Sequence, residues 1–137
     1  MIDGKRFAAC AWTLAAWGCA TMIVFSLSVF VPSTQRADFV RDLGALLEPT
    51  RVAPGCLGCR LYSDFEDPNA FLWVEEWDSR AMLDRHLRSD ACKTLLAAME
   101  LSTRPPLIRF DHVDRRDGFE VMEMARCPIN AFGSDRR

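Results

Sequence analysis

The segment 70–77 (AFLWVEEW) constrains the fold more than any other part of this chain, because bulky aromatic residues recur in it on alternate positions. A period of two is typical of a β-strand, in which successive side chains point to opposite faces of a sheet. The aromatic residues of the segment therefore share one face: Phe71, Trp73 and Trp77. We expect Leu72 and Val74 to point toward covering helices and the aromatic residues to point away from them. Such a patch would aggregate if it stayed exposed, so we predict a homodimer in which a second copy of the sheet covers it.

Strand and helix patterns alternate along the rest of the chain. Three further strands are predicted at about 23–31, 57–65 and 107–114, and a short fifth one at 119–125. A helix is predicted over 34–47, ended by Glu48-Pro49, and two helical pieces follow the N-cap residues Ser79 and Ser89. This order predicts an α+β fold of the ferredoxin-like, split βαβ type, with the helices on one face of an antiparallel sheet.

The first 21 residues need a separate interpretation. Lys5-Arg6 precedes an apolar stretch, 7–20, that has the length of a signal-peptide core and is too short to span a bilayer. Either translation begins at Met22, which we favour because the strand pattern starts there, or the segment directs export. We accordingly expect a cytoplasmic protein, exported in the alternative case, with an N-terminal extension at 1–21, one domain at 22–126 and a flexible tail at 127–137.

Composition argues against several classes of partner. The chain has 137 residues, with 17 Lys and Arg against 19 Asp and Glu and no basic stripe, so we expect neither nucleic acid nor a membrane as partner. Its six cysteines are irregularly spaced. Cys56 and Cys59 form a lone CxxC without further ligands at zinc spacing, so we interpret them as a turn cysteine followed by a buried one, with a redox or metal role as the alternative. We therefore expect no metal site.

A carboxylate lies among the aromatic residues of the 70–77 segment. By period-two counting Glu75 shares their face, and in an apolar space it must be paired, hydrogen-bonded or protonated. Arg109, in the strand predicted at 107–114, is a candidate partner. His86 is the second candidate acid or base, and the alternative is a packed residue bonded to a backbone carbonyl. Ser28 is small and would leave room for a ligand.

Short motifs in a distinctive order connect the chain to a known family. They are Pro54-Gly55-Cys56, Leu61-Tyr62 with Asp67-Pro68, Glu75-Glu76-Trp77-Asp78-Ser79, and His86-Leu87-Arg88-Ser89-Asp90. Together they resemble the antibiotic biosynthesis monooxygenase (ABM) domain, particularly its quinol monooxygenase-like members. The resemblance implies a dimeric α+β barrel that oxidises an electron-rich aromatic molecule with dioxygen, without metal, flavin or haem.

The resemblance also points to individual residues. Trp77 matches the family's tryptophan at the end of this strand, Glu75 its acidic residue two positions earlier, and His86 its helix histidine. Trp73 stands where polyketide-tailoring members have an asparagine, and Ser28 lies at or near a strand asparagine of haem-degrading relatives. The polar contacts of those two groups therefore do not transfer directly.

The predicted function is a cofactor-independent monooxygenase that acts on a small quinol-like or anthrone-like molecule. Glu75 or His86 is expected to be the catalytic residue that handles the proton. The predicted substrate-binding residues are Phe71, Trp73, Trp77, Ser28 and Arg109. Two alternatives stay open: a non-catalytic dimer that binds a small molecule, and an isomerase of a small metabolite, which arginines at the cavity mouth would favour.

Overall fold

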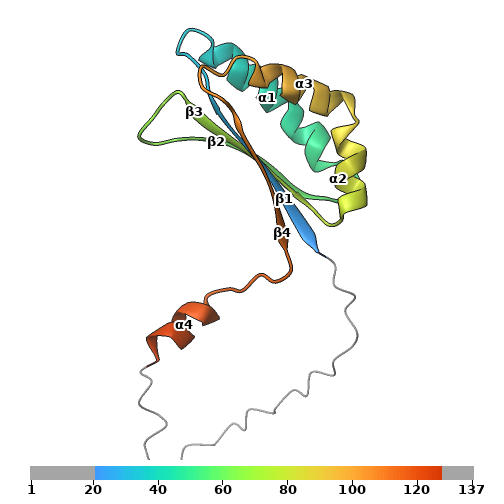
Figure 1. Ribbon diagram of the computed structural model, residues 1–137, viewed down its shortest axis with the longest axis vertical. Helices are drawn as coiled ribbons and strands as arrows, with labels where there is room; N and C mark the ends of the chain where they lie inside the picture. The colour runs from blue at the N-terminus through green and yellow to red at the C-terminus, as the bar shows by residue number, and fades with distance from the viewer. Residues whose placement is uncertain (1–20, 128–137) are drawn as a thin grey trace, which may run out of the picture.

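The computed structural model describes residues 21–127 and contains one four-stranded sheet with a layer of helices on one side (Figure 1). The elements follow in the order β1 (Met22–Phe30), α1 (Arg36–Arg51), β2 (Cys56–Ser63), β3 (Ala70–Trp77), α2 (Arg80–Leu87), α3 (Asp90–Met99), β4 (Leu107–Val113) and α4 (Glu120–Arg126). The strands lie in the order β2-β3-β1-β4, and every pair is antiparallel. The predicted α+β, ferredoxin-like architecture is confirmed. Predictions for residues 1–20 and 128–137 lie outside the described residues.

The register of the central strands places the predicted site residues. β1 and β3 pair so that Phe25 lies opposite Glu75 and Leu27 opposite Trp73. On the other side of β3, Cys59 of β2 also lies opposite Glu75. Directly opposed residues of an antiparallel pair point to the same face. Glu75 is therefore in the centre of one face, flanked by strands on both sides.

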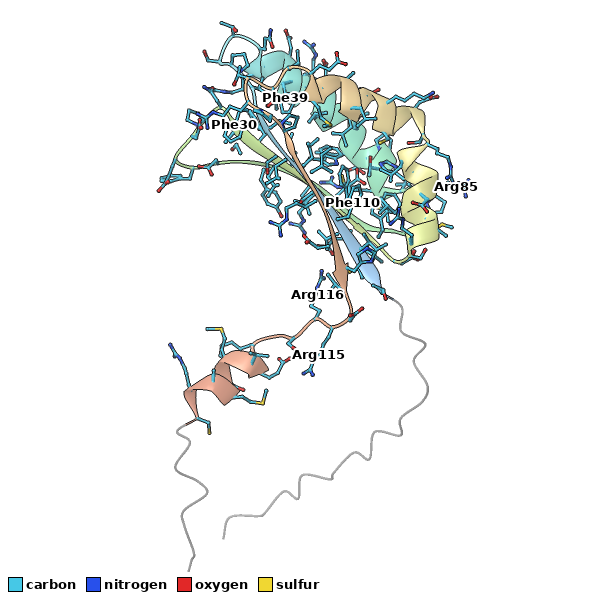
Figure 2. All side chains as sticks on the ribbon, viewed as in Figure 1. Phe30, Phe39, Arg85, Phe110, Arg115 and Arg116 are labelled. Carbon is cyan, nitrogen blue, oxygen red and sulfur yellow. The ribbon has the colours of Figure 1, made fainter. Side chains whose placement is uncertain are left out.

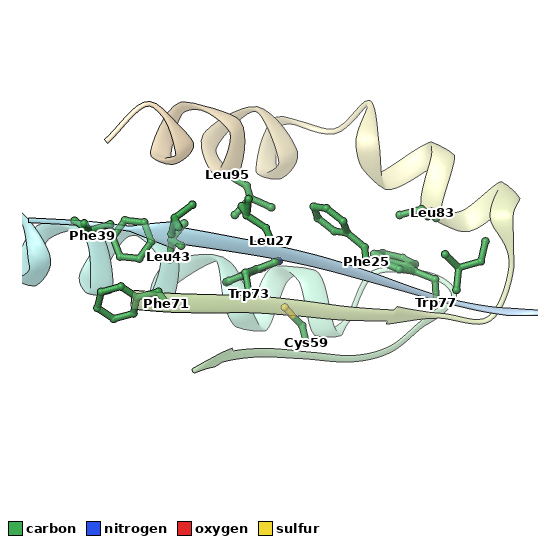
Figure 3. Close-up of a cluster of buried hydrophobic side chains, with 13 residues drawn as sticks. Phe25, Leu27, Phe39, Leu43, Cys59, Phe71, Trp73, Trp77, Leu83 and Leu95 are labelled. Carbon is green, nitrogen blue, oxygen red and sulfur yellow. The ribbon is translucent and has the colours of Figure 1, made fainter. Parts of the chain in front are cut away.

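The prediction of which face the helices cover is wrong. Phe71, Trp73, Glu75 and Trp77 are all buried and face the helices, whereas Leu72 lies on the other face and is 36% exposed. Figure 3 shows these aromatic residues in the core that the helices close. A period of two separates the side chains into two sets, but it does not say which set is covered. The helices cover the set with more apolar area, since each large aromatic side chain buries on the order of 150–250 Å².

One helix boundary and one element type also differ from expectation. α1 continues to Arg51 with Pro49 inside it. Proline removes only one backbone donor from the helix. In the last turn, Arg51 Nε donates a hydrogen bond to the carbonyl oxygen of Cys59 at 3.0 Å. The predicted fifth strand at 119–125 is instead the helix α4. Its Glu, Met, Ala and Arg residues are strong helix formers, which outweighs the short apolar pattern.

The two predicted N-caps of the helical layer are confirmed. Ser79 Oγ accepts a hydrogen bond from the backbone N–H of Met82 at 3.4 Å, and Ser89 Oγ accepts one from that of Cys92 at 3.3 Å. Each bond satisfies a backbone donor that has no partner within its helix. Ser79 thus fixes where α2 begins, which sets the position of His86 over the sheet.

Candidate functional site

The buried carboxylate of Glu75 has indole partners from its own strand. Trp73 Nε1 donates to Glu75 Oε1 at 2.8 Å, and Trp77 Nε1 donates to Oε2 at 2.8 Å. Residues two apart on a strand point to the same face, so the Trp-x-Glu-x-Trp spacing itself brings the three side chains together. An indole N–H can only donate, so both carboxylate oxygens act as acceptors. These bonds offset part of the cost of burying a carboxylate in an apolar core.

His86 completes this cluster from α2. Its Nε2 lies 3.1 Å from Glu75 Oε1, and the two side chains are 5% and 0% exposed. The imidazole also packs on the indole of Trp77, with ring centroids 4.8 Å apart at an angle of 32°. We assign the proton of this bond to Nε2, because Oε1 already accepts from Trp73. The structure thus brings together the two residues that were predicted to be catalytic, while their roles stay a prediction.

A pocket of about 300 Å³ opens beside His86 and Trp77. It lies where α2 meets the connection from α1 to β2, and its lining is Ala53, Pro54, Trp77, Met82, Arg85, His86 and Ser89. Within residues 21–127 no hydrogen bond to His86 Nδ1 is found, whereas Nε2 is bound to Glu75, and His86 is one of the residues that line the pocket. This is the arrangement of a histidine base oriented by a carboxylate.

Arg85 and the Gly55 turn shape the mouth of this pocket, and the sequence analysis did not single out either for that role. Arg85 forms no ion pair with any residue in 21–127 and points outward from α2 (Figure 2). Gly55 has φ of 81°, and a Cβ there would collide with the side chains of Met82 and Asp78. A side chain at this position would therefore push the turn away from α2. The Pro-Gly step at 54–55 was the available sequence signal for this close approach.

The other predicted binding residues do not line this pocket. Trp73 is packed in the core, and Phe71 packs on Phe39 with ring centroids 5.0 Å apart. Ser28 lies on the uncovered face and lines a different pocket, of about 490 Å³, near the turn between β2 and β3. Phe71 also contributes to that pocket. The predicted group of five substrate-binding residues is therefore divided between the two faces of the sheet.

The predicted pairing of Glu75 with Arg109 is wrong. Arg109 lies opposite Ser26 of β1, whereas Glu75 lies opposite Phe25, so the two side chains point to opposite faces of the sheet. Arg109 instead lies 3.5 Å from Asp111 on its own strand and is exposed to solvent. A shift of one residue in the register of a strand reverses its faces, and the sequence did not determine the register of β4.

The cysteine pair has the character expected of a turn cysteine followed by a buried one. Cys59 is buried on the covered face and Cys56 is partly buried at the start of β2. Burial raises the pKa of both thiols, with the Glu75 carboxylate adding to the effect. Within residues 21–127, no group of three or more His, Cys, Asp or Glu side chains is placed to hold a metal ion. None of the helices in the same range is long and apolar enough to cross a membrane.

Comparison with known proteins gives matches over most of the domain. An uncharacterized protein from Synechocystis sp. is 33% identical over 67 residues, which are 49% of this chain and 46% of that protein. The chain thus spans about half the length of this curated relative. A conserved protein from Methanosarcina mazei has a solved structure that matches with a TM-score of 0.64 at 23% identity, over 69% of this chain and 95% of that one.

The sequence and the fold agree on one family. A solved antibiotic biosynthesis monooxygenase matches with a TM-score of 0.59 at 24% identity, over 65% of this chain and 95% of that one, a likeness that shows the fold. The family model described as antibiotic biosynthesis monooxygenase matches residues 22–98, from the start of β1 almost to the end of α3, and includes Glu75, Trp77 and His86. Since this match covers more than half of the chain, the chain belongs to the antibiotic biosynthesis monooxygenase family.

Proposed function

We propose that the chain is a monooxygenase that oxidises a small, electron-rich aromatic molecule of the quinol or anthrone type with dioxygen. The observation that carries the proposal is the His86–Glu75 pair at the wall of a pocket that Trp77 also lines. A volume of about 300 Å³ is at the lower end of ligand pockets, which suits a molecule of one or two rings. Pro54 and Met82 supply apolar walls for such a ring.

His86 is the base in this proposal. Its Nδ1 removes the proton from the substrate, and Glu75, bound at Nε2, stabilises the imidazolium that forms. Glu75 itself is fully buried and acts as a positioning residue. The guanidinium of Arg85 at the pocket mouth would stabilise the substrate anion.

Dioxygen then accepts electrons from the substrate anion, and the resulting radical pair combines to a peroxide that loses water. One oxygen atom enters the product and the other leaves as water. The substrate supplies all four electrons, as a hydroquinone does when it becomes a hydroxyquinone, so the balance needs no external reductant. The protein therefore needs only to accept a proton, position the ring and exclude water from the site.

Oxygen uptake by the purified protein tests the proposal. A panel of hydroquinones and anthrones is measured with and without chelator, each against its own rate of autoxidation. We expect His86→Ala to lower turnover by about 10²- to 10⁴-fold, the usual contribution of a general base. The matched control is His112→Ala, which removes an imidazole from the exposed strand β4. Wild-type turnover in the double variant Glu75→Gln, His86→Ala would contradict the mechanism.

Binding without turnover is the second candidate function. The acceptor bonds of Glu75 are all made inside the protein, an arrangement that also fits a purely structural cluster. Arg85 at the pocket mouth would in addition suit an anionic metabolite, as an isomerase would require. Saturable quenching of Trp77 fluorescence by a quinol, without oxygen uptake, would favour a binding protein. Conversion of a phosphorylated or hydroxy-ketone metabolite without dioxygen would favour the isomerase.

We retain the homodimer as a proposal, on different grounds. The aromatic residues that first suggested it are inside the protomer. Its support is the opposite face of the sheet, where Tyr62, Leu72 and Leu107 are each more than a third exposed.

A further inference from the structure

The pocket beside His86 lies between one face of α2 and the connection from α1 to β2. On the helix side its lining residues stand three, four and seven positions after the first, which brings them to one face: Met82, Arg85, His86 and, just after the helix, Ser89. On the side of the connection the lining includes Pro54. Met82 and Pro54 thus offer apolar surface from two different elements, a shape that suits the flat body of an aromatic ring.

The lining of the pocket contains a guanidinium and no carboxylate. Arg85 forms no ion pair with any residue in 21–127. Asp84 and Asp90, the acidic residues nearest to it in the sequence, each pair with a basic residue of their own helix, at 2.7 and 3.0 Å. Asp78 lies near Gly55 but does not line the pocket. The charge of Arg85 is therefore available to an anionic ligand.

The other polar group of the pocket lies deeper. His86 is 7% exposed, and within residues 21–127 no hydrogen bond to its Nδ1 is found. Because the ring proton is assigned to Nε2, Nδ1 remains an acceptor. Arg85, by contrast, is exposed and points outward from α2 (Figure 2). A ligand that satisfies both residues presents a hydroxyl at its inner end and a negative charge at its outer end.

We propose that the substrate is an aromatic acid, a hydroxylated ring whose carboxylate binds Arg85 and whose phenolic hydroxyl donates to His86 Nδ1. The inference rests on the proposed function for the reaction that follows binding, in which the ring alone supplies the electrons and the carboxylate is unchanged. A carboxylate fits better than a phosphate ester. The lining offers one guanidinium, whose parallel N–H donors match a planar group of single charge, whereas a phosphate dianion needs further donors.

Calorimetric titration under nitrogen tests the proposal, because without dioxygen it measures binding and not turnover. The probes are 2,5-dihydroxybenzoate and its uncharged amide, 2,5-dihydroxybenzamide. We expect the wild type to bind the acid about 10- to 100-fold more tightly than the amide, the usual contribution of hydrogen bonds to a charged group. Arg85→Gln should remove this preference by weakening the acid alone. Since the Arg85 side chain is exposed and unpaired within residues 21–127, the circular dichroism spectrum should not change.

The matched control is Arg88→Gln, which removes the same charge from an exposed residue of α2's C-cap that does not line the pocket. At 0.15 M salt it should leave the preference for the acid within about twofold of the wild type, since exposed charges away from the site are screened. A wild type without this preference overturns the proposal, and so does an equal loss in both variants. Tighter binding of hydroquinone monophosphate than of the acid also overturns it.

Oxygen uptake separates this inference from the proposed function. Turnover of uncharged hydroquinones by a protein that does not prefer the acid would refute the aromatic acid and leave the monooxygenase standing. Binding of 2,5-dihydroxybenzoate that depends on Arg85, without oxygen uptake when air is admitted, would support the acid site and refute the monooxygenase.

Discussion

The two faces of the sheet carry side chains from the same strands and behave differently. Along β1, Ile23, Phe25, Leu27 and Val29 are all buried under the helices, while the residues between them are only partly covered. The covered face also holds the charged Glu75, whereas the open face, which is the side of the sheet away from the helices, holds Ser26 and Ser28. The difference shows that burial here follows the helix layer rather than the polarity of single residues. It assigns stability and candidate chemistry to the covered face.

The largest effect that would sharpen this contrast is expected at Glu75. Glu75→Ala leaves the donors of Trp73, Trp77 and His86 without an acceptor, so we expect a loss of about 3–5 kcal/mol in the free energy of unfolding. The neighbouring Glu76→Ala removes an exposed ion pair with Arg116 and should cost less than about 1 kcal/mol. Urea denaturation measures both. Equal losses would break the distinction between the faces.

The next contrast compares two leucines. Leu83→Ala on α2 removes a fully buried side chain, so unfolding should become easier by about 2–5 kcal/mol. Leu72→Ala on the open face should cost less than about 1 kcal/mol in a monomer. The comparison is made at a protein concentration at which sedimentation shows a monomer. A large loss for Leu72→Ala under that condition would show that something within the chain covers the open face.

Thiol reactivity gives an independent measure of burial. Burial raises the pKa of Cys59 on the covered face and of Cys92 on α3, which lowers the thiolate fraction at any given pH. We expect iodoacetamide at pH 8 to modify Cys59 at least about 100-fold more slowly than the exposed Cys127, as read by peptide mass spectrometry. The difference should vanish in denaturant. Fast modification of Cys59 in the native protein would mean that the covered face opens readily.

The smallest effect concerns the helix that carries His86. Ser79→Ala removes the N-cap bond to Met82, at an expected cost of about 1 kcal/mol. Ser33→Ala is the control, because α1 has Gln35 at its N-cap and no side-chain cap bond. It should change stability by less than about 0.5 kcal/mol. If Ser79→Ala also shifts the His86 imidazole resonances, the cap helps to place the ring over Trp77, and unchanged resonances would limit the role of the cap to stability.

Most of the fold and half of the candidate site were accessible from residue patterns. Period-two and helical spacings predicted every strand from β1 to β4 and the helices α1 to α3, because these patterns reflect local geometry. Glu75 and His86 were both singled out, one as a carboxylate in an apolar strand and the other as a histidine on the next helix. Arg85 and Ala53 were missed, since the pocket that they line depends on how a turn packs against α2. α4 was missed because seven residues carry too little periodicity to separate a strand from a helix.

What the sequence determined by itself is the local pairing of residues: alternate positions on β3 bring Trp73, Glu75 and Trp77 to one face, whatever covers it. Tertiary structure alone decided that this face is the inner one and that Arg109 lies on the other side. The physical reason is that side-chain alternation is a property of each strand, whereas the covered face depends on how strands register with one another and which apolar set the helices bury.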